Sequence, residues 1–118
     1  MYRFEQLEVW DLALRYCDAT YSIAGRLPRI ERFNLAEQLR RTSTSIPLNL
    51  AEGSTSQTRP EQARFVGMAI RSFLESVACC RLIERRGYLP PGELRPLTDV
   101  QGLKLFAKLQ ALRKSLVT

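Results

Sequence analysis

Apolar residues along the chain recur at intervals of three and four, which is the spacing of one face of an α-helix. The first pattern of this kind covers residues 5–26. Its apolar face comprises Leu7, Trp10, Leu14, Cys17, Tyr21 and Ala24. Pro28 ends the pattern, because a residue that precedes proline is displaced from the helical region of backbone conformation. We therefore predict a first helix over about residues 5–26.

A second helix is predicted over residues 34–56, and it begins with a capping pattern, Asn34 followed three residues later by Glu37. Drawn at about 100° per residue, its apolar stripe comprises Leu35, Leu39, Thr42, Ile46, Leu50 and Gly53. Pro47 falls about 100° to the far side of that stripe. We therefore predict that Pro47 lies on the outer, convex side of a bent helix and leaves the Ser43 carbonyl without its helical hydrogen bond. A helix broken outright at the proline is the alternative, but the stripe continues in phase across it.

A third helix is predicted over residues 59–88. Thr58 and Glu61 repeat the capping pattern at its start, and Pro60 lies in the first turn, where the missing N–H of proline costs nothing. Its inward positions are Val66, Ile70, Phe73, Leu74 and Val77. Gly87 and the Pro90–Gly92 turn then end it.

The fourth helix is predicted over residues 93–117, with its start left open. Gly92 is one candidate for the start, whereas Pro96 and a Thr98–Gln101 capping pattern favour a later one. The apolar face comprises Leu105, Leu109, Leu112 and Leu116. No segment alternates in the manner of a strand. Short connections between long amphipathic helices predict an all-α fold, a single-domain antiparallel up-down four-helix bundle over residues 1–118; three helices with a separate tail is the alternative.

A polar stripe runs along the second helix, displaced by roughly 100° from the apolar one. It comprises Gln38, Arg41, Ser45, Asn49, Glu52 and Ser56. One interpretation is a solvated face. The other is a partly buried polar seam, in which small side chains permit close packing and Arg41 pairs with Glu75 of the third helix. Such a pair would fix the helix register more than it would add stability.

Composition and length limit the class of protein. The 118 residues suit one domain with one core. No run approaches the roughly 20 apolar residues that cross a bilayer, and the first ten residues lack a signal-peptide pattern. We therefore expect a cytoplasmic protein that makes no membrane contact. The three cysteines are odd in number and two are adjacent, which predicts buried reduced thiols. They are Cys17, Cys79 and Cys80.

The chain has no histidine, so it lacks the commonest general base and the commonest metal ligand. Di-metal sites in bundles use Glu-x-x-His pairs, which are therefore absent. There is no Gly-rich phosphate loop and no nucleophile elbow. Asn49, Glu52 and Glu75 could form a polar pocket, but their spacing selects no reaction. We predict no enzymatic activity, no catalytic residues, no cofactor and no metal site.

A net charge of +6 and an isoelectric point near 9.7 suggest a polyanionic partner. On the third helix, three arginines at multiples of seven share a face and two more lie nearby, and on the fourth helix two lysines are one turn apart. The candidate nucleic-acid-binding residues are Arg64, Arg71, Arg81, Arg85, Arg86, Lys104 and Lys108. The competing interpretation is a solvated face, because Glu61, Glu75 and Glu84 interleave with the arginines. No RNA-binding motif with stacking aromatic residues is present.

Three stretches resemble the bacterial four-helix-bundle family of 23S rRNA intervening-sequence proteins: LEVW (7–10), LPRIERFNLAEQLRRTSTSIPLNLAEG (27–53) and FLE (73–75). The third helix departs from the family, which usually has Gly-Ser where this chain has Arg71-Ser72. The resemblance implies an antiparallel bundle that assembles into a ring-like homopentamer, with no established enzymatic activity.

The resemblance also bears on function. Some members are encoded within sequences that interrupt large-subunit ribosomal RNA genes. A related protein, the accessory factor of diversity-generating retroelements, is basic, binds nucleic acid and partners a reverse transcriptase. With the charge pattern, this leads us to expect a non-enzymatic homo-oligomer whose basic helix faces, repeated around a ring, bind RNA or DNA through phosphates. The alternative is a scaffold or accessory subunit that contacts a protein partner, for which Leu12 and Leu48 are candidates.

Overall fold

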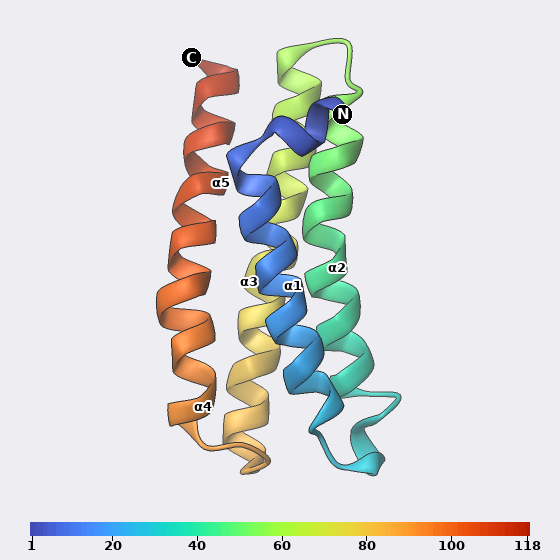
Figure 1. Cartoon of the computed structure of the whole chain (residues 1–118), viewed down its shortest axis with the longest axis vertical. Coiled ribbons are helices and arrows are strands. Elements are labelled where there is room, and N and C mark those ends of the chain that lie inside the picture. The colour runs from blue at the N-terminus through green and yellow to red at the C-terminus, as the bar shows by residue number, and fades with distance from the viewer.

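Four long helices make up most of the chain in a computed structural model that describes residues 1–118 (Figure 1). They are α1 (Glu8–Gly25), α2 (Leu35–Ser54), α3 (Arg59–Arg86) and α5 (Gly102–Val117). Shorter helical segments are η1 (Arg3–Gln6), η2 (Arg29–Glu31), α4 (Pro91–Arg95) and η3 (Pro96–Gln101), the last of which is π-helical. The predicted all-α four-helix bundle is confirmed.

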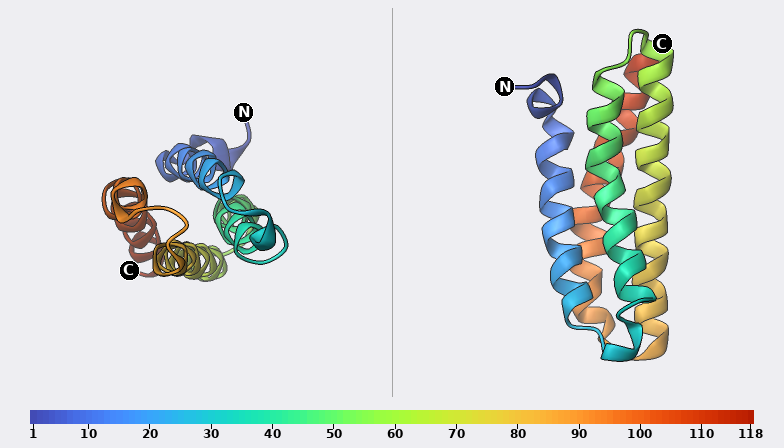
Figure 2. Two further views of the ribbon diagram at one scale, coloured as in Figure 1. Left: turned by 90° about the horizontal axis from the view of Figure 1, so that it is seen from below. Right: turned by 90° about the vertical axis from the view of Figure 1, so that its right-hand side faces the viewer.

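Seen end-on, the long helices surround one core in the order α1, α2, α3, α5 (Figure 2). The closest packing is between α2 and α3, and the loosest is between α1 and α5. The two chain termini lie at the same end as the α2–α3 connection (Figure 1). The opposite end, which we call the loop end, is formed by residues 26–34 and 87–90. None of the helices combines the length and apolar character that crossing a bilayer requires.

A line of aromatic rings joins three helices through the core. Tyr16 of α1 is fully buried, and its ring centroid lies 5.3 Å from that of Phe73 on α3. Phe73 in turn stacks on Phe106 of α5 at 5.5 Å. The Tyr16 hydroxyl lies 2.6 Å from the Ser76 hydroxyl, so its polar atom is paired although the residue is buried. Burial raises the pKa of Tyr16 well above its ordinary value, so the phenol stays neutral.

Of the caps predicted for the starts of α2 and α3, one is present and the other is wrong. Thr58 Oγ1 accepts a hydrogen bond from the Glu61 backbone N–H at 3.2 Å, as predicted for the start of α3. At the start of α2 the Asn34 side chain caps nothing. It donates instead to Glu31 Oε1 at 2.9 Å, and the same oxygen accepts from the Leu35 backbone N–H at 3.4 Å. The carboxylate that satisfies the helix start therefore comes from the segment before the helix.

The last helical region begins earlier than either predicted start and is not interrupted by Pro96. Helical conformation runs from Pro91 through the π-helical segment into α5. Within the π segment the Gly102 N–H donates to the Leu97 carbonyl, five residues earlier. This longer hydrogen-bond spacing accommodates a proline that cannot donate. Thr98 lies in the interior of this helical region, with its Oγ1 3.3 Å from the Leu94 carbonyl oxygen one turn earlier, so it does not cap a helix start.

Pro47 is buried, so its predicted position on the outer side of α2 is wrong. The helix lies between α1 and α3 and therefore buries a wider arc than its apolar stripe. The buried positions Ser43, Pro47, Leu50 and Ser54 follow one another at helical spacing. The helix is continuous across the proline. The Ser43 carbonyl, which Pro47 cannot bond, accepts a hydrogen bond from Cys17 Sγ of α1 at 2.9 Å.

Candidate nucleic-acid interface

The predicted arginines of α3 differ in how far their charge is compensated. Arg64 Nη2 lies 2.8 Å from Glu61 Oε1, and its guanidinium carbon lies 4.6 Å from the centroid of the Phe65 ring. The hydrogen bond with Glu61 raises the pKa of Arg64. Arg71 and Arg85 are exposed and form no ion pair. These two cations are therefore available to an external anion, whereas Arg64 has a partner on its own helix.

Arg81 belongs to an ion-pair network that holds η3 against α3. Its Nη2 lies 2.9 Å from Asp99 Oδ1, and its Nη1 donates to Thr98 Oγ1 at 3.1 Å. Arg95 completes the network with Glu84 at 3.0 Å. Hydrogen bonds from Thr98 and then Arg81 lower the pKa of Asp99. The charge of Arg81 is thus compensated within the fold.

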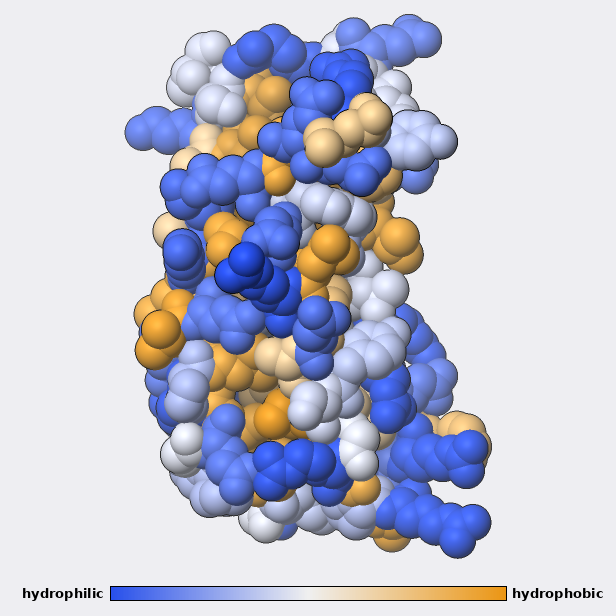
Figure 3. Space-filling view, viewed as in Figure 1, coloured by the Kyte–Doolittle hydropathy of each residue, from blue (hydrophilic) through white to orange (hydrophobic).

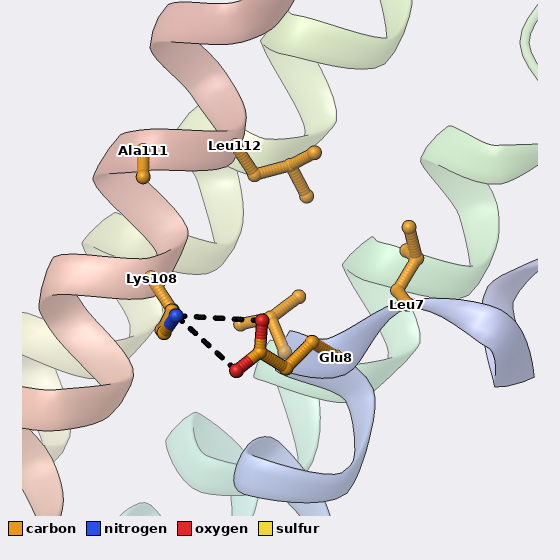
Figure 4. A pocket seen from close by; sticks show the side chains of 6 residues that line it. Leu7, Glu8, Lys108, Ala111 and Leu112 are labelled. Atoms are coloured by element: carbon orange, nitrogen blue, oxygen red, sulfur yellow. Dashed lines mark hydrogen bonds and ion pairs between the residues drawn. The ribbon is translucent and has the colours of Figure 1, made fainter.

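The two predicted lysines of α5 differ in whether they have an acidic partner. Lys108 Nζ lies 3.2 Å from Glu8 Oε1 and 3.3 Å from its Oε2, and this ion pair closes a pocket between the two helices (Figure 4). The pocket walls are otherwise mainly apolar: Leu7, Val9, Ala111 and Leu112. Lys104, one turn earlier, is exposed and forms no ion pair. Of the two lysines, only Lys104 is therefore available to an external anion.

Arg86 is exposed, forms no ion pair and lies at the loop end. Its positive charge contributes to lowering the pKa of Glu31, although the hydrogen bond from Tyr88 contributes most. Four of the seven predicted cations consequently remain without an acidic partner. They are Arg71, Arg85, Arg86 and Lys104.

The polar stripe of α2 forms one side-chain hydrogen bond to α3, at its middle. Ser45 Oγ lies 2.8 Å from Ser72 Oγ of α3, and Asn49 Nδ2 donates to the Ser45 carbonyl at 2.8 Å and to its hydroxyl at 2.9 Å. Gln38 and Glu52 are exposed. Within α2 the partly buried part of the stripe is therefore one turn long, whereas Ser56, which lies beyond the end of the helix, is half-buried. Ser72 was not singled out from the sequence, although it is the small residue through which α3 meets the seam.

The predicted Arg41–Glu75 pair is wrong. Arg41 Nη2 lies 2.6 Å from Glu37 Oε1, one turn earlier on the same helix. An acid four residues before a base is already in reach on the helix surface, so it competes successfully with a carboxylate on another helix. Glu75 is exposed and lines a shallow depression with Ser72, Arg71 and the seam residues.

The three cysteine thiols are protonated and form no disulfide bonds. Cys79 and Cys80 are buried and Cys17 is half-buried, and none forms a disulfide. Burial raises the pKa of Cys17 to about 11 and that of Cys80 to about 12. All three thiols therefore keep their protons at neutral pH, because burial also raises the pKa of Cys79. No three or more Cys, Asp or Glu side chains gather in a group that could hold a metal ion.

A further group of cations, which the sequence analysis did not single out, lies at the loop end. Arg29, Arg32 and Arg40 line one pocket between the end of α1 and the start of α2. None of them forms an ion pair with a protein carboxylate. In Figure 3, hydrophilic side chains project at the lower right corner, where the loop of residues 26–34 lies in the same view of Figure 1. These three arginines lie close together in the sequence, within the stretch 27–53 that resembles the family, so the sequence offered a sign of this cationic group.

The family model described as "23S rRNA-intervening sequence protein" matches residues 5–101. The chain belongs to this family. The match includes α1, α2, α3, α4 and η3, and it contains the seam and the arginine pocket of the loop end. The family's description refers to 23S ribosomal RNA and names no catalytic activity. No curated protein matches the chain significantly.

Proposed function

We propose that the protein is a non-enzymatic homo-oligomer that binds nucleic acid through phosphate contacts, in the cytoplasm where ribosomal RNA is found. The observation that carries the proposal is the set of exposed cations without acidic partners. Arg71, Arg85, Arg86 and Lys104 remain free in a chain with a net charge of +6. Such groups can replace the counterions of a nucleic-acid backbone, which gives affinity without sequence specificity.

Self-association is the second part of the proposal. The large apolar side chains exposed on α3, η3 and α5 include Leu82 (47%), Val100 (71%), Leu103 (57%) and Leu74 (50%). The predicted inward position of Leu74 is therefore wrong. In Figure 3, apolar side chains are exposed at the edge of the molecule over α5, with hydrophilic side chains between them. A ring-like assembly, a homopentamer as the resemblance implies, would cover apolar side chains of this kind and repeat the free cations. Because several linked subunits would bind one nucleic-acid strand together, weak phosphate binding by each subunit would give the assembly a high overall affinity. A solution mass equal to that of one chain would contradict this part.

The proposal is tested by removing free and paired cations in equal number. The first variant combines Arg71→Gln, Arg85→Gln and Lys104→Gln. The matched control combines Arg15→Gln, Arg41→Gln and Arg64→Gln, whose guanidinium groups each have an acid three or four residues away. Both variants lose three charges, and exposed pairs of this kind add little stability.

We expect the free-cation variant to bind RNA and DNA at least fivefold more weakly than the matched control, by fluorescence anisotropy at equal salt. Equal affinity of the two variants would contradict the role of the free cations. Absence of binding by the unaltered protein would contradict the function itself.

A second candidate function, a protein-interaction scaffold, is favoured by one observation. Leu48 on α2 is 61% exposed, whereas Leu12 is half-buried and packs against the core. A stoichiometric protein partner that is lost in Leu48→Ser, together with the absence of co-purifying nucleic acid, would favour the scaffold.

A further inference from the structure

We propose that Arg29, Arg32 and Arg40, with the exposed ring of Phe33, bind a segment of single-stranded nucleic acid, the arginines holding phosphates and Phe33 stacking on a base. This inference rests on the proposed function. It gives that function a defined site at the loop end, which none of the seven predicted cations lines.

Three of the residues that line the pocket are arginines. Its other lining residues are small or apolar: Ala24, Gly25, Leu27, Pro28 and Ala36. No acidic residue lines it. The pocket lies where α1 ends and α2 begins, so two arginines come from the connecting segment and Arg40 comes from the second turn of α2. The fold therefore brings three arginines to one pocket, and none of them has an ion pair with a protein carboxylate.

The neighbouring acids already have partners. Glu31 accepts hydrogen bonds from Tyr88 Oη at 2.6 Å and from Asn34 Nδ2 at 2.9 Å. Glu37 pairs with Arg41, and Glu93 pairs with Arg26. Guanidinium donors left without protein acceptors are suited to phosphate, which they bind in a planar, two-pronged manner.

Aromatic rings accompany these arginines. Phe33 is 80% exposed, and the guanidinium carbon of Arg32 lies 5.1 Å from the centroid of its ring. The guanidinium carbon of Arg40 likewise lies 5.9 Å from the ring centroid of Tyr21. Proteins bind single-stranded nucleic acid with exposed aromatic rings beside a cationic groove. The rings stack on the flat faces of the bases, and the cations contact the phosphates. A duplex hides its base faces, so it would use the arginines and leave Phe33 without a partner.

The test compares full-length variants that carry the same net charge. The pocket variant combines Arg29→Gln, Arg32→Gln and Arg40→Gln, and the control combines Arg15→Gln, Arg41→Gln and Arg64→Gln, whose guanidinium groups already have acidic partners. A third variant, Phe33→Ala, removes the ring alone. The probes are a dye-labelled 12-nucleotide oligouridine and a 12-base-pair RNA duplex. Melting curves by circular dichroism confirm that each variant is folded, and single arginine substitutions replace the triple variant if it melts early.

We expect the pocket variant to bind the single strand at least tenfold more weakly than the control does. Its log–log salt dependence should be shallower than that of the unaltered protein by about two, because three contacts to single-stranded phosphates contribute about 0.7 each. Phe33→Ala should weaken single-strand binding by about tenfold and leave duplex binding within about twofold of the unaltered protein.

Equal losses in the pocket and control variants would show that binding follows net charge, which overturns this inference and leaves the proposed function standing. Undiminished single-strand affinity in Phe33→Ala would overturn the stacking contact. Pocket variants that bind RNA normally and lose a protein partner would make the surface a protein-docking site instead. No RNA binding by the unaltered protein would overturn both proposals.

Discussion

At the scale of single residues, the centre of α2 depends on a hydrogen bond from another helix. Pro47 has no N–H to offer the Ser43 carbonyl, and the Cys17 thiol of α1 donates to it at 2.9 Å. A carbonyl left unpaired in a packed interface costs about 1–3 kcal/mol. Because burial raises the pKa of Cys17 to about 11, the thiol remains a donor throughout the neutral range. The proline and the cysteine thus act as a pair.

This pairing predicts a coupling between positions 17 and 47. Cys17→Ala should lower the free energy of unfolding by about 1 kcal/mol, whereas Cys17→Ser, which keeps a donor, should lower it less. In a Pro47→Ala background, the restored backbone N–H bonds Ser43, so the same Cys17→Ala change should cost less. Urea denaturation of the four proteins of this cycle measures the coupling. An identical cost in both backgrounds would show that the thiol does not replace the missing amide.

Glu31 is a second residue with a decisive local role, because it joins the loop end to the start of α2. It is 7% exposed and accepts hydrogen bonds from Tyr88, Asn34 and the Leu35 backbone N–H. These bonds, that from Tyr88 first, lower its pKa below the ordinary value of 4.5. The ionised carboxylate is therefore the form that the fold prefers.

Acid should therefore destabilise the protein through Glu31. Since its folded pKa lies below its unfolded one, its stabilisation is complete above about pH 4.5 and is lost as pH falls through the folded pKa. We expect Glu31→Gln to be less stable than the unaltered protein at pH 6, with the difference shrinking by pH 3. Thermal melts across this range measure it, with Glu52→Gln, an exposed carboxylate, as the control. A difference that stays constant with pH would contradict this role.

At the scale of elements, small residues set how closely α2 and α3 approach. The Ser45 and Ser72 hydroxyls lie 2.8 Å apart. A Cβ atom added at Gly53 would lie 2.9 Å from Phe65 Cβ and 3.4 Å from the Gln62 carbonyl oxygen. Since neither neighbour is the mobile end of a side chain, the two helices would have to move apart.

Gly53→Ala should accordingly destabilise the protein by about 1–3 kcal/mol, although alanine favours helix by about 1 kcal/mol over glycine. Gly25→Ala is the matched control, because a Cβ added at this last residue of α1 meets nothing within 4 Å. It should leave stability unchanged or raise it. Chemical denaturation separates the two, and equal effects would contradict the close approach.

The helices themselves were largely predictable, and the errors in predicting their details have local causes. The Thr58 cap was predicted correctly because its hydrogen-bond partner, the Glu61 backbone N–H, lies only three residues further along the chain. Asn34 was mispredicted because the carboxylate at that helix start comes from Glu31, outside the pattern. The burial of Pro47 was missed because the helical projection of α2 shows a single apolar stripe, whereas α2 packs against α1 on one side and α3 on the other.

At the scale of the whole molecule, the fold followed from the sequence but the free cations did not. Helical periodicity is a local property, so four amphipathic segments were sufficient to predict a bundle. Whether a cation is free depends on distant contacts, such as that of Lys108 with Glu8 or of Arg81 with Asp99. The pocket at the loop end was missed for the same reason, since Arg40 joins the other two arginines only in the folded chain.

The most direct test of the account is the salt dependence of RNA binding by the unaltered protein. Fluorescence anisotropy with the 12-nucleotide oligouridine, at several salt concentrations from 50 to 200 mM, gives the slope of log affinity against log salt. Four or more phosphate contacts predict a slope near −3 and a loss of affinity of about 50-fold across this range. Affinity that does not change with salt, or no binding at 50 mM, would contradict the claim that this basic bundle holds nucleic acid by its phosphates.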